Sequence, residues 1–388
     1  MARQRAVNFP SQATRTNSVP AVSAGVFPLS IDASGRFLKQ ADGTPFFIHG
    51  DTAWSICNQL TNAQVDTFLN DCQTKGFNTL VVELIERYAT SQTPRHLNVD
   101  GVAPFNPMSP VDWATPVEAF WQRVDYIING CKSRGIVVLA FPAYSGFPGR
   151  DEGWDDEYNA ESDADLQAYG TFLGNRYTQG NIIWVGAGDK SITGAEQTKQ
   201  LNILSAIRAV QPNALMTGHG TTNEDTRTFW SSSYTDMDLV YKWEAYGGYP
   251  FAGIATSYAR SPVKPAFLFE GQYEGSASAA QCRRQAYTSV LAGGCGHVYG
   301  HGGMWAFSAP VIDSTEWTTY LDATARVQMA YVKQTVTLVK SALAPSSIRI
   351  RLYNPTNGTY STHTASTSNT GTASVATGGE RVIVVDAA

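Results

Sequence analysis

Acidic side chains close several apolar stretches of this sequence, and Asp189 and Glu270 are the strongest candidates for chemistry among them. Asp189 follows the apolar run 181–185, and Glu270 follows the run 266–269. A carboxyl group at the end of a buried strand loses its hydration, and this is costly unless a partner compensates for it. Stability of the fold alone therefore does not favour an acid at this position. Two such groups can cleave a glycosidic bond: one carboxylic acid protonates the leaving oxygen, and one carboxylate attacks or activates water. We therefore predict Asp189 and Glu270 as a catalytic pair.

Other polar and aromatic residues stand at or just beyond the ends of the same apolar runs. Acids together with Trp and Tyr suit a sugar, because carboxylates accept hydroxyl protons and aromatic faces stack on its apolar face. Asp51 could instead cap the turn that follows it, and Glu83 could pair with Arg87. The predicted substrate-binding residues are Asp51, Trp54, Glu83, Tyr144, Lys190, His219, Trp243, Glu244, Tyr273, Glu274, His301 and Trp305.

Other chemistries find less support in the sequence. His49, His219, His297 and His301 could converge with Asp51 on a metal ion, but no H-E-x-x-H or clustered ligand spacing is present. A serine nucleophile is also disfavoured, since no G-x-S-x-G motif occurs. The 28 Lys and Arg against 33 Asp and Glu give a net charge of -5, which disfavours nucleic acid and anionic membranes as partners. We expect a carbohydrate substrate, no metal and no cofactor.

The elements that must position these residues repeat along the chain. A helical pattern ends in a basic residue and Gly, or in Pro, and an apolar run of strand length follows at once. Alternating units of this kind predict a (β/α)₈ barrel, whose active site lies at the carboxyl ends of the strands. An open doubly wound sheet is the alternative, but the turn after Ile48 lacks its Gly-rich pattern. The predicted strands are 45–48, 77–84, 136–141, 181–185, 214–217, 237–241, 266–269 and 297–299.

Helix starts are marked independently of the apolar runs. Thr61 with Gln64 and Thr115 with Glu118 have the spacing of capping boxes, and Pro116 would take the first helical position. Further helices are expected near 163–177, 195–210, 278–291 and 315–338. The cysteines are widely spaced and odd in number, so we predict buried free thiols at Cys57, Cys72, Cys131, Cys282 and Cys295.

The two ends of the chain differ from its middle. Residues 31–47 are expected to form short antiparallel strands, and residues 346–388, rich in Thr, Ser and Gly, a small β appendage. The predicted domains are an N-terminal arm (1–29), the barrel (30–340) and the appendage (341–388). No apolar run is long enough for a membrane helix, and residues 1–25 do not resemble a secretory signal peptide. Localisation stays open, with an extracellular or virion-associated place favoured by the substrate class.

Several ordered motifs resemble one family of enzymes. Gly35-Arg-Phe-Leu, followed by Asp42-Gly-Thr-Pro-Phe-Phe-Ile-His-Gly-Asp-Thr-Ala-Trp54, resembles the opening of the DUF4038, or apiosidase-like, glycoside hydrolases (similar to glycoside hydrolase family 140). The segments 76–78, 181–189, 273–275 and 296–301 resemble later motifs of that family in the same order. The resemblance spans roughly residues 30 to 340.

This resemblance implies a retaining glycosidase acting on a plant or bacterial polysaccharide or oligosaccharide. Asp189 would be the acid/base residue and Glu270 the nucleophile, with Glu274 as the main rival for the second role. The chain departs from the family in having Ala187-Gly-Asp where members usually have Gly-Gly-Asp, and in a tail too short for a complete β-sandwich. The alternative is a non-catalytic glycan-binding or virion-associated adhesion protein on the same barrel.

Overall fold

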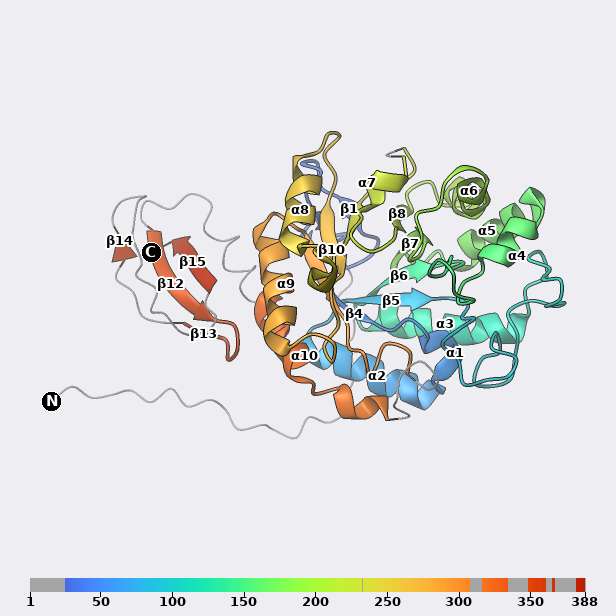
Figure 1. The fold of residues 1–388 in the computed structure, drawn as a ribbon, viewed down its shortest axis with the longest axis horizontal. Helices are drawn as coiled ribbons and strands as arrows, with labels where there is room; N and C mark the ends of the chain where they lie inside the picture. The colour runs from blue at the N-terminus through green and yellow to red at the C-terminus, as the bar shows by residue number, and fades with distance from the viewer. Residues whose placement is uncertain are drawn as a thin grey trace.

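Eight parallel strands form a barrel surrounded by helices in the computed structural model (Figure 1), which describes residues 25–231, 233–307, 316–333, 348–360, 365–366 and 382–387. The strands follow the order β8-β7-β6-β5-β4-β11-β10-β9. The two ends of this order meet, because the backbone N–H of Asp236 donates to Met216 O at 2.7 Å and Thr217 Oγ1 donates to Met237 O at 3.0 Å. The predicted (β/α)₈ barrel is confirmed, and the open doubly wound sheet is wrong. The strands are β4 (Ile48–Thr52), β5 (Thr79–Glu83), β6 (Val137–Phe141), β7 (Ile182–Ala187), β8 (Leu215–His219), β9 (Asp238–Tyr241), β10 (Ala266–Glu270) and β11 (Gly296–Tyr299).

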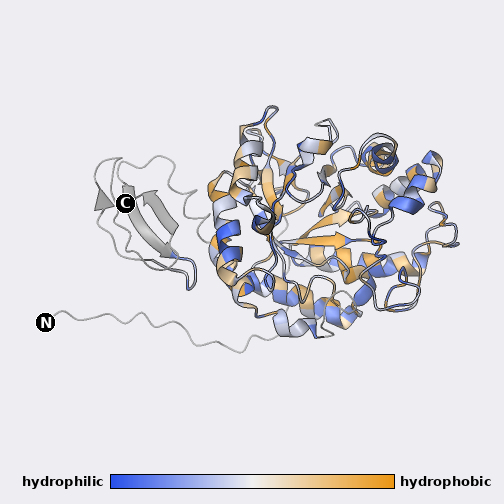
Figure 2. Cartoon of the chain, viewed as in Figure 1, coloured by the Kyte–Doolittle hydropathy of each residue, from blue (hydrophilic) through white to orange (hydrophobic). Residues whose placement is uncertain are grey.

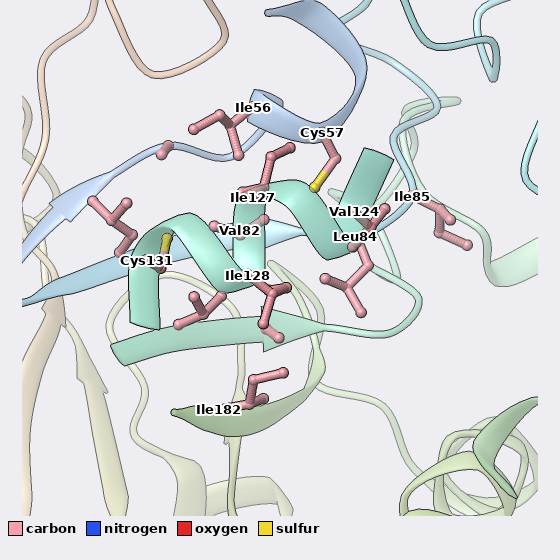
Figure 3. Close-up of a cluster of buried hydrophobic side chains, with 14 of the residues drawn as sticks. Ile56, Cys57, Val82, Leu84, Ile85, Val124, Ile127, Ile128, Cys131 and Ile182 are labelled. Carbon is pink, nitrogen blue, oxygen red and sulfur yellow. The ribbon is translucent and has the colours of Figure 1, made fainter. Parts of the chain in front are cut away.

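Apolar side chains of the barrel strands are buried on both faces, which explains their continuous hydrophobic runs (Figure 2). Leu139 packs inside the barrel, whereas the adjacent Val138 packs outward. Figure 3 shows part of the outer layer, in which Val82 meets Ile127 and Cys131 of the helix after β5. All five cysteines are buried free thiols, as predicted.

Most of the predicted helices are present, but the predicted start of the helix near residue 118 is wrong. The capping box of Thr61 and Gln64 is formed at the start of α2. The helix near 118 begins only at Glu118, after Val117, because Thr115 Oγ1 instead donates to the carbonyls of Asn106 and Asp112 in the preceding turn. The helices are α1 (Ile56–Gln59), α2 (Asn62–Lys75), α3 (Glu118–Ser133), α4 (Asp155–Ala160), α5 (Asp163–Arg176), α6 (Gly194–Val210), α7 (Thr226–Phe229), α8 (Pro250–Ala259), α9 (Ala279–Leu291) and α10 (Thr324–Gln328), with 3₁₀ turns η1 (Glu244–Tyr246) and η2 (Trp317–Tyr320).

Described residues on either side of the barrel in the sequence form small antiparallel sheets. Before the barrel lie β1 (Ser30–Ile31), β2 (Leu38–Lys39) and β3 (Pro45–Phe46), as expected. The first barrel strand was predicted at 45–48, but it runs over Ile48–Thr52, since 45–46 pair with β2 instead. Near the C-terminus, β12 (Ile348–Asn354) pairs with β13 (Thr359–Tyr360), β14 (Ala365–Ser366) and β15 (Val382–Ala387). The single helix expected at 315–338 is wrong for the described residues 316–333, which contain a 3₁₀ turn at Trp317–Tyr320 and a separate short helix at Thr324–Gln328; residues 315 and 334–338 lie outside the described residues. None of the described helices has the length and apolar character to cross a membrane.

Candidate active site

The backbone that carries Asp189 leaves strand β7 in an unusual conformation. Ala187 and Asp189 have positive φ angles of 62° and 49°, and Gly188 between them has a φ of 135°. Such conformations are costly for residues other than glycine and are often found at functional sites. A Cβ atom on Gly188 would lie 2.1 Å from Cδ2 of Tyr144, so this position also needs glycine for space. The tight turn holds Asp189 against Tyr144, whose hydroxyl donates to Asp189 Oδ2 at 2.7 Å.

His219, the last residue of β8, connects the two predicted catalytic carboxyls. The backbone N–H of Asp189 donates to Nδ1 of His219 at 2.8 Å, so Nδ1 is an acceptor and the neutral ring carries its proton on Nε2. Nε2 lies 3.1 Å from Oε2 of Glu270 and therefore donates to that carboxylate. His219 is fully buried and its burial lowers its pKa to about 4, which keeps the ring neutral at physiological pH. One imidazole thus fixes the position of both acids.

A second chain of hydrogen bonds reaches Glu270 from the opposite side. Trp54 Nε1 donates to the hydroxyl of Tyr273 at 2.8 Å. Burial raises the pKa of Glu270, and a hydrogen bond from the Tyr273 hydroxyl opposes part of this rise. Glu270 therefore receives hydrogen bonds from Tyr273 and His219, whereas Asp189 receives one side-chain hydrogen bond, from Tyr144. Oδ1 of Asp189 is buried and has no hydrogen-bond partner among the described residues.

The two carboxyls together hold one proton near neutral pH. Burial, with a smaller contribution from the charge of Glu270, raises the pKa of Asp189 to about 6. Burial raises the pKa of Glu270 to about 8. The order of these values favours the proton on Glu270, whereas the N–H of His219 that points at Glu270 favours the ionised form of that carboxyl. The pair has the mixed protonation that acid/base and nucleophilic chemistry requires.

Metal binding is the other chemistry that this cluster suggests. Ligand atoms of Asp189, His219 and Glu270 lie within 4.8 Å of one another. Both nitrogens of His219 are engaged, however, since Nδ1 accepts from the Asp189 N–H and Nε2 must then carry the proton. A metal ion needs a free nitrogen lone pair from histidine, so this arrangement fits a pair of carboxyls better than a metal centre.

A pocket of about 580 Å³ opens above the pair at the carboxyl ends of the strands. Asp189 and Glu270 both line it. The predicted substrate-binding residues that also line it are Trp54, Glu83, Tyr144, Trp243, Tyr273 and Trp305. Aromatic faces and carboxyl oxygens therefore surround the same space, as sugar binding requires.

Three of the other predicted substrate-binding residues form ion pairs away from the pocket lining. Asp51 accepts from Nε of Arg326 at 2.7 Å in a fully buried pair. Lys190 contacts Asp155 at 2.7 Å and Glu196 at 2.8 Å. Glu244 pairs with Arg284 at the surface. In each case a charged partner far away in the sequence holds the side chain.

The remaining three also have structural partners. His219 lies beneath the carboxyl pair rather than facing the pocket. Glu274 accepts from the backbone N–H groups of Ala325 and Arg326 at the start of α10. His301 stacks on Tyr320 with ring centroids 4.3 Å apart, and its Nδ1 accepts from the N–H of Gly303. These six residues are not among the described residues that line the pocket, and their part in substrate binding stays a prediction.

The buried Arg326 yields a prediction about stability. Replacing Arg326 by methionine should lower the free energy of unfolding by about 3–5 kcal/mol, because Asp51 would remain buried without its counter-charge. Urea unfolding monitored by circular dichroism would measure the loss. The matched control is Arg284→Met, whose pair with Glu244 has a half-exposed guanidinium and should cost less than about 1 kcal/mol. A similarly small loss for Arg326→Met would contradict the prediction.

Part of the pocket was missed by reasoning from the sequence. These residues lie mostly on loops, which have no periodicity to identify them, although Tyr241 closes strand β9 and could have been found by the strand-end rule. The missed lining residues are Glu86, Tyr88, Ala89, Phe147, Arg150, Glu152, Thr221, Thr222, Asn223 and Tyr241.

A closed parallel barrel with a half-buried and a buried acid at the carboxyl ends of its strands, in an aromatic-lined pocket, has the architecture of a barrel glycoside hydrolase. Residues 32–341 match the sequence profile described as "Apiosidase-like, catalytic domain". The chain therefore belongs to the apiosidase-like family and is a glycoside hydrolase, so the non-catalytic alternative is set aside. No curated protein sequence matches this chain significantly.

Solved structures share the fold at low sequence identity. One, described as a glycoside hydrolase, has a TM-score of 0.76 and 20% identity and covers 93% of this chain and 97% of its own. A glycoside hydrolase family 5 protein from Bacteroides vulgatus has a TM-score of 0.75 and 20% identity, with 93% of each chain covered. An endo-1,4-β-mannanase from Rhizomucor miehei is more distant, with a TM-score of 0.51 and 14% identity over 78% of this chain and 99% of that one. These similarities concern the fold alone.

Proposed function

We propose that the chain is a retaining glycoside hydrolase in which Asp189 is the acid/base residue and Glu270 the nucleophile. The observation that carries the proposal is the closeness of the two carboxyls, which have oxygens within 4.8 Å of each other in one pocket. Retaining glycosidases place their carboxyls about 5 Å apart, whereas inverting enzymes leave about 6.5–9.5 Å for a water molecule. The proposed barrel domain is 30–340, with 341–388 as a β appendage.

The contacts of each residue suit its proposed step. In the first step Glu270 attacks the anomeric carbon while Asp189 donates its proton to the leaving oxygen. The hydrogen bonds from His219 and Tyr273 keep Glu270 ionised and oriented for this attack. In the second step Asp189, now ionised, removes a proton from water, which then breaks the glycosyl ester on Glu270. Asp189 lines the pocket with 20% of its side chain exposed, so its carboxyl can reach the leaving oxygen and the water.

The proposed substrate is a plant or bacterial polysaccharide or oligosaccharide, the class that the resemblance to the apiosidase-like family implies. The pocket supports this class because Trp54, Trp243 and Trp305 line a space of about 580 Å³, which is large enough for a sugar ring and its neighbours. Loops decide specificity in barrels, so the sugar must be found by experiment. Nucleic acid as a partner remains disfavoured by the net charge of -5.

The protonation of the pair predicts a bell-shaped pH dependence of kcat/KM. Below about pH 6 both carboxyls carry protons, so no nucleophile is present, and above about pH 8 both are ionised, so no proton reaches the leaving oxygen. Activity should therefore peak between these values. Initial rates from about pH 4 to 10 at constant ionic strength would measure it, with circular dichroism confirming that the protein stays folded. A rate that keeps rising above pH 8 would contradict the shared proton.

The experiment that tests the proposed function is a screen of polysaccharides with analysis of the products. Neutral and acidic plant and bacterial glycans would be incubated with the wild type and with a Glu270→Gln control. Reducing sugar should appear only with the wild type, and proton NMR at early times should show the anomeric configuration of the substrate retained in the product. An inverted first product would reject the double displacement. Binding without any product would reject the proposed catalysis.

A further inference from the structure

Glu83 is a third carboxyl in the pocket that the proposed mechanism does not use. It is the last residue of β5, it lines the pocket, and only 4% of its surface is exposed. Its backbone is held in place, since its N–H donates to Trp54 O at 2.9 Å. Its side-chain oxygen Oε2 is buried and has no hydrogen-bond partner among the described residues. An ionised carboxylate in this position would leave a buried negative oxygen without a donor, which is costly.

The charged groups around Glu83 add to this cost. Its carboxyl neighbours are Glu86, Glu152 and Asp189, and burial followed by these charges raises the pKa of Glu83 well above its ordinary value. Glu86 already accepts three backbone N–H groups, of residues 87 to 89, and Glu152 accepts the N–H of Phe147. Glu86 and Glu152 therefore have hydrogen-bond donors of their own, whereas no donor reaches Oε2 of Glu83 among the described residues.

The nearby cations are directed elsewhere. Arg150 lines the pocket, but its side chain is 63% exposed and lies 3.9 Å from Glu152. Arg87, which the sequence suggested as the partner of Glu83, instead pairs with Asp151 and Glu157. Neither arginine is within ion-pair distance of Glu83 in the part of the chain that the structure describes. The alternative of a structural Glu83–Arg87 pair is therefore wrong.

From this geometry we propose that Glu83 remains a neutral carboxylic acid and donates a hydrogen bond to a hydroxyl oxygen of the bound sugar. Oε2 is enclosed by protein, but Glu83 lines the pocket and keeps 4% of its surface exposed, so the carboxyl donates through its pocket-facing side, where a sugar hydroxyl supplies the acceptor. The same surroundings define a substrate class: the unit next to Glu83 is an uncharged sugar, because a uronate carboxylate would lie beside Glu152 and the ionised member of the catalytic pair. This inference rests on the proposed function of the pocket, but the protonation of Glu83 can be tested without any substrate.

The first test is infrared spectroscopy of the protein alone near pH 7. The double variant Asp189→Asn/Glu270→Gln removes the shared catalytic proton. If this variant still shows the carbonyl band of a protonated, buried carboxyl, that band should belong to Glu83. Adding Glu83→Gln should remove that band, whereas adding Glu118→Gln, an exposed glutamate on α3, should leave it unchanged. Absence of the band from the double variant, or its survival in the presence of Glu83→Gln, would overturn the proposal even if the enzyme is fully active.

The second test measures kcat/KM on the polysaccharide that the screen identifies. Glu83→Ala should lower kcat/KM by about 10- to 100-fold, since a hydrogen bond to the substrate is lost, and Glu83→Gln should recover much of this loss because its amide is also a neutral donor. Equal losses in both variants would overturn the donor role. Polygalacturonate cleaved more efficiently than every neutral glycan in the screen would overturn the substrate class. If nothing is cleaved, the proposed function fails, and the infrared band still decides the protonation of Glu83.

Discussion

Replacing Glu270 by glutamine is expected to lower kcat by about three orders of magnitude or more, because an amide cannot form the glycosyl ester of the double displacement. The fold should persist, since the amide oxygen of glutamine can still accept the hydrogen bond from His219, whose Nε2 lies 3.1 Å from Oε2 of Glu270. Initial rates on the polysaccharide identified by the screen, together with thermal unfolding of both proteins, would measure the effect.

Two further variants make this result specific. Glu118→Gln applies the same chemical change to an exposed glutamate that pairs with Arg176 on the outer face of the barrel, and it should leave kcat unchanged. Glu274→Gln tests the rival nucleophile. The Glu274 carboxylate accepts hydrogen bonds from Tyr299 and from the start of α10. Its replacement should therefore lower the unfolding temperature, while kcat should change little. If turnover disappears in Glu274→Gln and survives in Glu270→Gln, the assignment of the nucleophile is wrong.

The barrel could be predicted from the sequence because its strands are buried on both faces. Such strands appear as short continuous apolar runs, and each follows a helix end marked by Gly or Pro. The prediction was wrong where a local pattern had two possible partners. Thr115 has the spacing of a capping residue but donates to carbonyls of the preceding turn, and Pro45 and Phe46 belong to the small sheet rather than to the barrel.

The candidate site could be predicted only in part, for a similar reason. The strand-end rule located Asp189, Glu270 and most of the aromatic residues in the pocket, because strand ends converge in a parallel barrel. It could not distinguish an acid that faces the pocket from one that has a buried partner. Asp51 is paired with Arg326, 275 positions later in the chain, and no local pattern indicates such a contact. The position of His219 between the two carboxyls could not be predicted from the sequence either, because it depends on which ring nitrogen accepts the N–H of Asp189.

Replacing Asp189 by asparagine should lower kcat on a polysaccharide by about 10²- to 10⁴-fold, because the leaving oxygen would depart without a proton. Asparagine is suited to the positive φ of 49° at this position, and its backbone N–H would still donate to His219, so the site should keep its shape. The effect should depend on the leaving group. A dinitrophenyl glycoside of the same sugar needs no protonation in the first step, so it should give a fast burst of phenolate followed by slow turnover.

Added azide then separates the roles of the two carboxyls. An anion can attack the glycosyl ester on Glu270 without a general base, so azide should restore turnover of Asp189→Asn and yield a glycosyl azide with the configuration of the substrate. Asp163→Asn, on the outer helix α5, is the matched control and should show neither the burst nor the rescue. A glycosyl azide of inverted configuration would mean that Asp189 is the nucleophile and Glu270 the acid, the assignment that the pKa order of the pair alone would favour. The configuration of the glycosyl azide therefore decides which carboxyl carries the proton. Retention would show that the donors around Glu270 keep the proton on Asp189, and inversion would show that burial keeps it on Glu270.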